Sequence, residues 1–276
     1  MKFGISTFVD DDSIDSVSLG RAVEERGFHS LVVAEHSHIP ASRESAYPEG
    51  GELPSWYYKT LDPFVTLAAV AAVTSTIELF TGVALLVQRD PIHTAKEAAS
   101  IDLISGGRFV FGVGAGWNLE EMRDHGTEPK NRGALLDERI EAIKALWTDD
   151  PAEYHGKYVD FDPAFIWPKP VQKPYPPIYI GGESPAALRR LATYGDGWLP
   201  RVRTPPAEIR RVRNWLAEQG RDSVRFTVFG ADTDEGHLAG FAEAGVEEVT
   251  LTLDTLSEDD TLRSLDALAA VAAAHR

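Results

Sequence analysis

The stretch IYIGGESPAALRRLATYGDGWL, residues 178–199, decides the fold. A short apolar run opens it, a segment of helical spacing follows, and a second short apolar run closes it, which predicts a strand, a helix and a strand. Ser184 and Pro185 mark the start of the helix, because serine caps a helix and proline fits its first turn. The stretch is therefore one unit of a parallel sheet in which a helix joins neighbouring strands.

The same alternation runs through the whole chain. The eight predicted strands cover residues 3–9, 30–34, 77–87, 108–113, 178–180, 197–199, 224–229 and 246–253. The eight predicted helices cover residues 14–26, 61–73, 91–104, 135–147, 185–194, 205–219, 235–244 and 258–274. Dividing the 276 residues by eight gives about 35 residues per unit, close to the length of a βα repeat. We therefore expect an α/β fold, a (β/α)8 TIM barrel in one domain over residues 1–276.

A doubly wound open sheet is the alternative fold. Such a sheet usually carries a glycine-rich turn after its first strand, where this chain has Val9-Asp10-Asp11-Asp12. The barrel needs no such turn, and it accounts for all eight units with one closed sheet.

Two irregular segments interrupt the alternation. Residues 37–60 follow the second strand and are polar, with several glycines and prolines. Residues 151–177 precede the fifth strand and contain seven prolines, too many for a helix or a central strand. We expect both segments to be insertions that together form a lid over the functional site.

Composition and charge exclude several classes of protein. The 43 acidic and 27 basic side chains give a net charge of −16, with no basic cluster that would attract nucleic acid or an anionic membrane. The absence of cysteine excludes disulfides, thiolate nucleophiles and iron–sulfur clusters. No apolar run is long enough to span a membrane, and the N-terminus lacks the pattern of a signal peptide. We therefore expect a cytoplasmic protein that binds neither nucleic acid nor membrane.

The C-terminal ends of barrel strands are where functional groups gather, and the second strand ends at Glu35 and His36. Histidine transfers protons near neutral pH, and the neighbouring carboxylate could orient it or raise its pKa. A structural hydrogen-bonded pair is the alternative. His36 and His38 also resemble half of a metal site, but the later strand ends supply no lysine and no second histidine pair, so we expect no metal.

Glycines mark three further strand ends. Gly82 lies inside the third strand, GVGAGWN (112–118) follows the fourth, and Gly181-Gly182-Glu183-Ser184 follows the fifth. Alternating glycines remove side chains, so a flat ring can approach the backbone, and Trp117 could stack beside it. Free N–H groups at a helix start favour a phosphate, although ordinary capping and packing would also explain these residues. Together the strand ends indicate a planar cofactor with a phosphate tail.

Five motifs now carry a resemblance to a known family. They are VVAEHSHIP (32–40), LFTGVALLVQRDP (79–91), IDLISGGRFVFGVGAGWN (101–118), WPKPVQKPYPPIYIGGESPAALRRLA (167–192) and GDGWLP (195–200). In this order they resemble the bacterial luciferase-like monooxygenase superfamily, above all its branch of F420-dependent oxidoreductases, where F420 is a deazaflavin coenzyme. The resemblance runs from residue 1 to about residue 200 and continues more loosely to the C-terminus.

The resemblance implies a role for each matched residue. His36 would be the catalytic histidine near the reactive carbon of the cofactor ring, with Glu35 beside it. The Gly82–Val83 bond would be a cis peptide behind the ring. The other cofactor-binding residues that it implies are Gly114, Gly116, Trp117 and Asn118 along the cofactor channel, and Gly181, Gly182, Glu183 and Ser184 around the phosphate.

The activity implied is hydride transfer between F420 and a small organic substrate. Two alternatives stay open: a monooxygenase that uses reduced flavin mononucleotide (FMN) from a partner reductase, and a non-catalytic cofactor-binding protein. Trp117 stands where the sugar-phosphate dehydrogenase branch has an acid, so glucose 6-phosphate is not an expected substrate. Because F420 carries a phosphate and an oligoglutamate tail, we expect Arg89, Arg201 and Arg203 to offset its charge. Many relatives are dimers, and the apolar helix 61–73 could form the interface of a homodimer.

Overall fold

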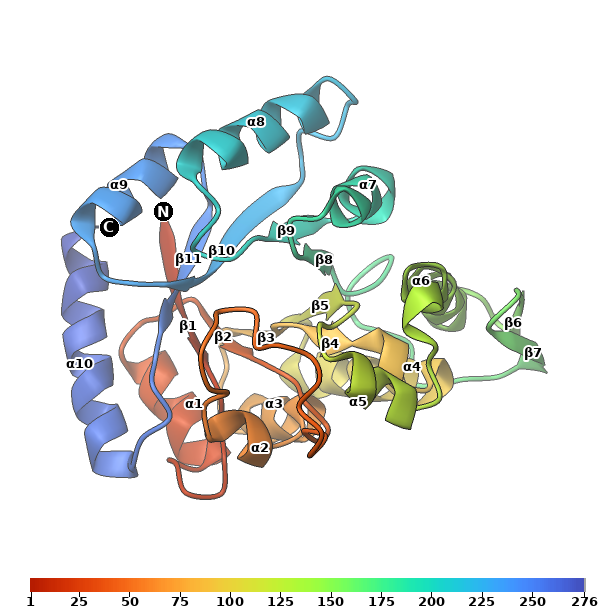
Figure 1. Cartoon of the computed structure of the whole chain (residues 1–276), viewed down its shortest axis with the longest axis horizontal. Coiled ribbons are helices and arrows are strands. Elements are labelled where there is room, and N and C mark those ends of the chain that lie inside the picture. The colour runs from red at the N-terminus through yellow and green to blue at the C-terminus, as the bar shows by residue number, and fades with distance from the viewer. Residues whose placement is uncertain (276) are drawn as a thin grey trace.

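Parallel pairing of neighbouring strands closes the sheet into a barrel (Figure 1). The computed structural model describes residues 1–275. The eight strands of the ring are β1 (Lys2–Thr7), β2 (Ser30–Val33), β3 (Glu78–Thr81), β5 (Phe109–Gly114), β8 (Ile178–Gly181), β9 (Gly197–Leu199), β10 (Arg225–Ala231) and β11 (Glu248–Thr252). β1 pairs with β2 and β11, and the pairing of β3 with β5 completes the ring. The predicted (β/α)8 barrel is confirmed.

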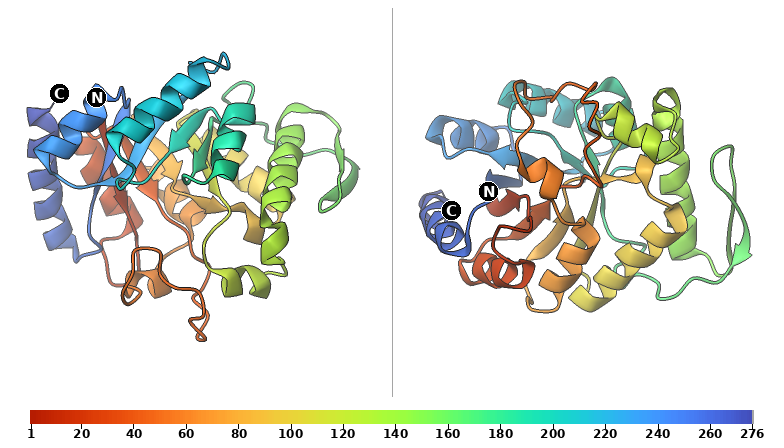
Figure 2. Two further views of the ribbon diagram at one scale, coloured as in Figure 1. Left: turned by 45° about the horizontal axis from the view of Figure 1, so that its top comes forward. Right: turned by 60° about the horizontal axis from the view of Figure 1, so that its bottom comes forward.

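Helices surround the barrel, one after each strand of the ring (Figures 1 and 2). They are α1 (Ser16–Glu25), α3 (Pro63–Ala71), α4 (Pro91–Ser105), α6 (Arg132–Thr148), α7 (Pro185–Tyr194), α8 (Pro206–Ala217), α9 (Glu235–Glu243) and α10 (Glu258–Ala274). The side chains of Asp15, Asp62 and Asp90 cap α1, α3 and α4 by accepting backbone N–H groups of the first turn. Within residues 1–275, no helix has the length and apolar character needed to cross a membrane.

Apolar side chains pack on both faces of the sheet. A small buried cluster joins five strands through Val32, Phe80, Val110, Tyr179 and Leu199. Their neighbours in each strand belong to the larger core, because successive strand side chains point to opposite faces. The small cluster fills the barrel interior beneath the C-terminal strand ends, so the site above it has a packed floor.

The third predicted strand, 77–87, is interrupted in the structure. β3 ends at Thr81, the Gly82–Val83 peptide is cis as the resemblance implied, and the two-residue strand β4 (Ala84–Leu85) follows. A Cβ on Gly82 would lie 2.3 Å from Cγ1 of Val32, so only glycine fits this bend. A 3₁₀ turn (Leu86–Gln88) then leads to α4.

The two insertions lie at opposite ends of the barrel. Residues 37–60 follow the C-terminal end of β2 and include α2 (Trp56–Lys59). The second insertion contains an antiparallel hairpin, β6 (Ala152–His155) and β7 (Asp160–Ala164), which lies beyond α6 at the edge of the molecule (Figure 2).

The second insertion is fixed at the N-terminal end of the strands. Gln172 Nε2 donates to the carbonyl of Phe109, the first residue of β5, at 2.7 Å. Lys169 Nζ donates to the carbonyl of Leu146 in α6 at 2.9 Å. A segment that precedes a strand enters at the strand's N-terminal end, away from the functional face. The expectation that residues 151–177 form part of the lid is therefore corrected.

Candidate active site

A cavity of about 690 Å³ opens at the C-terminal ends of the barrel strands. We call it the main cavity. Eleven of the twelve predicted site residues line it: Glu35, His36, Gly82, Val83, Gly114, Gly116, Trp117, Gly181, Gly182, Glu183 and Ser184. These residues come from the ends of four strands of the ring, β2, β3, β5 and β8, and meet around one space, as the barrel rule predicted.

Asn118 is the predicted residue that does not line the main cavity. It is almost completely buried and caps α5 (Leu119–Asp124), where its Oδ1 accepts the N–H of Glu121 at 3.3 Å. The expectation that Asn118 lines the cofactor channel is therefore corrected. The backbone turns into α5 after Trp117, so the Asn118 side chain points to the helix rather than to the cavity.

His36 is held by a carboxylate that the sequence did not indicate. Its Nδ1 lies 2.7 Å from Oε2 of Glu121, and both side chains are buried. The other oxygen of Glu121 accepts the backbone N–H of Ser37 at 2.9 Å. Burial alone would raise the pKa of Glu121, but the hydrogen bonds from His36 and Ser37 outweigh it and lower that pKa. Glu121 is therefore a buried carboxylate.

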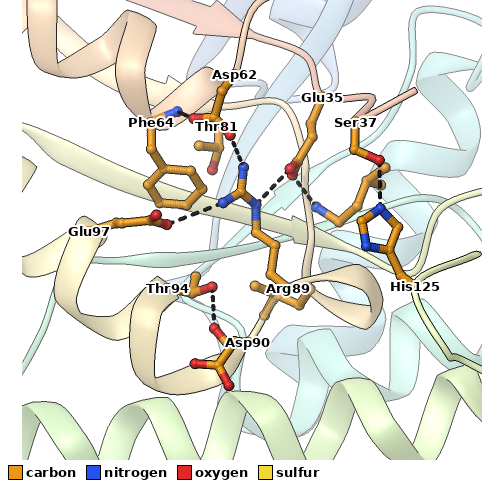
Figure 3. Close-up of polar contacts among 12 residues, drawn as sticks. Glu35, Ser37, Asp62, Phe64, Thr81, Arg89, Asp90, Thr94, Glu97 and His125 are labelled. Atoms are coloured by element: carbon orange, nitrogen blue, oxygen red, sulfur yellow. Dashed lines mark hydrogen bonds and ion pairs between the residues drawn. The ribbon is translucent and has the colours of Figure 1, made fainter.

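Glu35, the expected partner of His36, faces the other way. Its two oxygens accept the Arg89 Nε–H and the Leu85 backbone N–H, each at 2.6 Å (Figure 3). Alternating side-chain direction explains this, because neighbours in an extended chain point to opposite sides. The suggestion that Glu35 orients His36 is therefore wrong.

Arg89 is surrounded by carboxylates outside the main cavity. It pairs with Glu35, Asp62 and Glu97 and lies over the Phe64 ring (Figure 3). Burial alone would lower the pKa of Arg89, but these carboxylates outweigh it and raise that pKa. Arg89 lines a smaller, neighbouring cavity of about 380 Å³. Its expected role in offsetting the charge of the cofactor tail is corrected, because Arg89 does not line the main cavity and three carboxylates surround its guanidinium.

Aromatic side chains form the wall around His36. The His36 ring lies 5.2 Å from the ring of Tyr57 and 5.5 Å from that of Trp117, and Tyr47 packs against both. Burial, and then the neighbouring Tyr47, raises the pKa of Tyr57, which therefore stays a neutral phenol. Tyr47 and Tyr57 come from the first insertion, so residues 37–60 do cover the site.

The glycines of the opposite wall make room for Val83. A Cβ on Gly114 would lie 2.6 Å from Cγ2 of Val83, and a Cβ on Gly181 would lie 2.7 Å from its Cγ1. The side chain next to the cis peptide therefore sits between two bare backbone segments. Together these residues give the cavity an apolar wall.

Besides Glu35, whose charge is matched by Arg89, two glutamates and three arginines line the main cavity. Arg201 pairs with Glu183 at 2.6 Å, and Glu49 from the first insertion lies 3.1 Å from Arg203 and 3.4 Å from Arg201. Arg132 donates to the carbonyl of Pro129 and forms no ion pair within residues 1–275. These five groups leave a positive balance inside a chain of net charge −16.

Ser184 begins α7 beside the glycine pair. Its Oγ accepts the N–H of Ala187 at 3.2 Å, and Pro185 takes the first helical position. Gly182 has φ +92°, a conformation that favours glycine, and its carbonyl accepts the Trp198 indole N–H. Glu183 turns to Arg201 rather than into open space, so this carboxylate holds a cation at the cavity wall.

Potential metal ligands lie together at the other end of the barrel. His29, Glu78 and Glu248 have ligand atoms within 4.8 Å of one another. Lys2 Nζ lies 2.9 Å from His29 Nε2, so an ammonium group already contacts this cluster. Ser30 donates to Glu248 at 2.6 Å. The expectation of no metal stays a prediction.

Sequence reasoning missed Glu121, Arg132, Tyr47 and Tyr57. Asn118 and Glu121 have the spacing of a capping box, a pattern that predicts a local hydrogen bond back to the helix start. In the structure the Glu121 side chain reaches His36 instead. For the two tyrosines, the only available signal was that their segment follows a strand end.

Comparison with known proteins agrees with this architecture. Residues 1–233 match the family model of luciferase-like monooxygenases. The uncharacterized protein Rv0953c of Mycobacterium tuberculosis is 39% identical, and the match covers 98% of each chain. The chain belongs to the luciferase-like monooxygenase family, and it is an oxidoreductase of the luciferase-like class.

Solved structures share the fold at low sequence identity. Monooxygenase RslO1 from Streptomyces bottropensis has a TM-score of 0.79 at 20% identity and covers 100% of this chain and 99% of its own. An F420-dependent secondary alcohol dehydrogenase, in complex with an F420–acetone adduct, has a TM-score of 0.75 at 19% identity over 100% of both chains. The oxygenating constituent of 3,6-diketocamphane monooxygenase from Pseudomonas putida, in complex with FMN, has a TM-score of 0.66 at 17% identity, covering 84% of this chain and 67% of its own. Structural neighbours thus include both F420 and FMN enzymes.

Proposed function

We propose that the protein is an F420-dependent oxidoreductase that transfers a hydride between the deazaflavin and a small organic substrate. The observation that carries this proposal is the composition of the main cavity, which combines His36, an apolar wall and three arginines. Arg201 and Arg203 are 36% and 45% exposed, so an anionic tail that extends out of the cavity would meet them. A coenzyme with a phosphate and several carboxylates fits such a series of cations better than one with a single phosphate.

Different residues of the main cavity would bind the cofactor and take part in the chemical step. Val83, between Gly114 and Gly181, would support the ring, and Ser184 with Arg132 would hold the phosphate. The bound deazaflavin would supply two-electron hydride chemistry, because a carbon replaces the reactive nitrogen of flavin. His36 would hold or release, at Nε2, the proton that balances the charge of the substrate. Tyr57 and Trp117 would exclude water from the reacting atoms.

A binding titration tests this proposal. Purified protein is titrated with F420 and, separately, with FMN, each oxidised and reduced, and fluorescence is followed at fixed ionic strength. We expect F420 to bind more tightly than FMN, and Arg132→Ala to weaken F420 binding. Preference for reduced FMN would overturn the F420 assignment, and F420 binding without turnover on a broad substrate panel would favour a non-catalytic binding protein.

An FMN-dependent monooxygenase is the second candidate function. The Ser184 cap with its two preceding glycines suits one phosphate, which FMN also carries. This function would need oxygen and a partner reductase that supplies reduced flavin. Oxygen consumption in the presence of reduced FMN and a reductase is the measurement that would favour it.

We also propose that the protein forms a homodimer through α3 and α4. These adjacent helices expose apolar side chains, among them Val65, which is 69% exposed, Leu103 and Ile104. Large exposed apolar side chains on neighbouring elements are typical of protein interfaces. Sedimentation analysis of the wild type and of Val65→Asp tests the proposal: a dimer that dissociates in the variant supports it, and a monomeric wild type contradicts it.

A further inference from the structure

The contact between Glu121 and His36 joins the start of α5 to the end of β2. Glu121 is fully buried, and both of its oxygens serve the same strand end, one through His36 Nδ1 and one through the Ser37 N–H. We propose that Glu121 is the positioning residue of His36: it keeps a hydrogen on Nδ1 and presents Nε2 to the main cavity. This assignment rests on the proposed function, in which His36 handles the proton.

The hydrogen on Nδ1 follows from the chemistry of the pair. A carboxylate can only accept hydrogen bonds, so at 2.7 Å the imidazole nitrogen must be the donor. Nε2 makes no hydrogen bond within residues 1–275, and His36 lines the main cavity. In the neutral form Nε2 therefore carries a lone pair toward the cavity, and in the charged form it carries an N–H.

The charge of Glu121 is not cancelled by another neighbour. Glu35 and Arg89, beside His36, neutralise each other. His125 Nε2 lies 2.7 Å from Ser37 Oγ, but burial and then His38 lower the pKa of His125, so it stays neutral near pH 7. The remaining contacts of the His36 ring are the neutral rings of Tyr57 and Trp117. His36 is thus the histidine in direct contact with the carboxylate of Glu121.

The preceding residue of the same helix provides a matched control. Glu120 accepts the backbone N–H of Ser45 at 2.7 Å and the Ser45 hydroxyl, and it does not contact His36. Both glutamates therefore fix the segment that follows β2, but only Glu121 touches the imidazole. Glu120→Gln separates loop anchoring from the effect on His36.

Nitrogen-15 NMR of the histidine side chains in the ligand-free protein tests the assignment, with His36→Gln identifying the signal. In the wild type we expect the neutral His36 ring to carry its hydrogen on Nδ1. In Glu121→Gln the single amide oxygen must serve the Ser37 N–H, which turns the amide NH2 toward Nδ1. We therefore expect the neutral His36 ring to shift toward the Nε2–H tautomer. Glu120→Gln should match the wild type.

Two results would overturn the assignment. One is a wild-type ring with its hydrogen on Nε2, which requires no variant and so no assumption about folding. The other is a Glu121→Gln protein, folded by circular dichroism, whose His36 tautomer equals that of Glu120→Gln.

Kinetics separate the positioning role from the proposed function. With F420 and a substrate, Glu121→Gln should lower kcat at least tenfold, with KM little changed. If F420 fails to bind while the NMR result holds, the proposed function fails and the assignment of Glu121 stands. If F420 is turned over while the His36 tautomer stays unchanged in Glu121→Gln, only the assignment fails.

Discussion

The two insertions look alike in sequence and lie at opposite ends of the barrel. Residues 37–60 bring Tyr47, Glu49 and Tyr57 to the main cavity, whereas none of its lining residues comes from 151–177. The first follows a strand and the second precedes one, and only the C-terminal ends of the strands face the site. Position relative to a strand, rather than proline and glycine content, therefore indicates a lid.

Two short histidine–carboxylate contacts, one beside the first insertion and one within the second, allow the two regions to be compared in numbers. His36, immediately before the first insertion, lies 2.7 Å from Glu121, and His155, in the second, lies 2.6 Å from Asp160. The side chains of the first pair are 5% and 0% exposed, and those of the second are 54% and 74% exposed. The two contacts are equally short, so any difference in their importance comes from burial and location.

Replacing each histidine by alanine is the strongest test of the comparison. His36→Ala removes the group that handles the proton, so we expect kcat to fall by about 10²- to 10⁴-fold. His155→Ala removes an exposed contact far from the main cavity and should leave kcat within about twofold of the wild type. Steady-state kinetics with F420 on the two purified variants provide the measurement.

Circular dichroism confirms that both variants are folded before the rates are compared. Undiminished turnover in His36→Ala would remove the proton role of His36. A comparable loss in His155→Ala would mean that the second insertion belongs to the site after all.

Gln172→Ala tests what the second insertion does instead. The side-chain amide of Gln172 donates to the buried Asp102 carboxylate and to the Phe109 carbonyl, each at 2.7 Å. Losing these bonds leaves buried acceptors unpaired, so we expect the free energy of unfolding to fall by about 1–3 kcal/mol with kcat unchanged. Urea unfolding at pH 7 measures the change.

The matched control is Gln219→Ala, since Gln219 is exposed and makes one local bond to the Trp215 carbonyl. It should change stability by about 0.5 kcal/mol or less. Equal effects of the two substitutions would show that the second insertion does not anchor the barrel.

Most of the barrel could be predicted from the sequence because its boundaries are marked locally. The helices Pro185–Tyr194 and Glu258–Ala274 and the strand Gly197–Leu199 agree at both ends, since caps, prolines or glycines bound them. The third strand was predicted too long. Its apolar residues continue through Gly82 and Val83, but β3 ends at Thr81, and Val32 of the neighbouring strand leaves no room for a Cβ at position 82, a closeness that no local pattern encodes.

The site residues likewise fall into those that a local sequence pattern marks and those that it does not. The glycines at 114 and 181 and His36 were found because strand ends and motifs mark them, and all three line the main cavity. Glu121 was missed because its partner, His36, lies 85 residues earlier in the chain. The sequence suggested Glu35 instead, because it is adjacent to His36. Contacts between distant segments therefore account for what the sequence did not predict.

Glu49→Gln tests the first insertion with a smaller effect. Glu49 pairs with Arg201 and Arg203, so it competes with an anionic ligand for both cations. Removing this charge should tighten F420 binding about two- to fivefold, the value of a partly exposed ion pair, and steepen its salt dependence. Fluorescence titration at two ionic strengths is the measurement.

The corresponding control in the second insertion is Glu153→Gln, which removes a carboxylate 3.8 Å from His155. It should leave F420 binding unchanged. Weaker binding in Glu49→Gln would mean that Glu49 orients the two arginines for the ligand instead of competing with it.

The smallest expected difference is in the pH dependence of stability. The hydrogen bond with Asp160 raises the pKa of His155 above 6.5, so its stabilising contribution is complete below the unfolded value and is lost as the pH rises through the folded one. The contribution of Glu121 to stability depends on pH in the opposite direction. Its pKa is lowered in the folded protein, so its stabilising contribution is present above about pH 4.5 and is lost as the pH falls. Urea unfolding of the wild type and of His155→Ala should therefore differ most near about pH 6 and converge toward about pH 8, whereas the wild type and Glu121→Gln should converge on acidification. A gap between the wild type and His155→Ala that widens with rising pH would contradict this sign, and would indicate that Asp160 no longer holds His155 in solution.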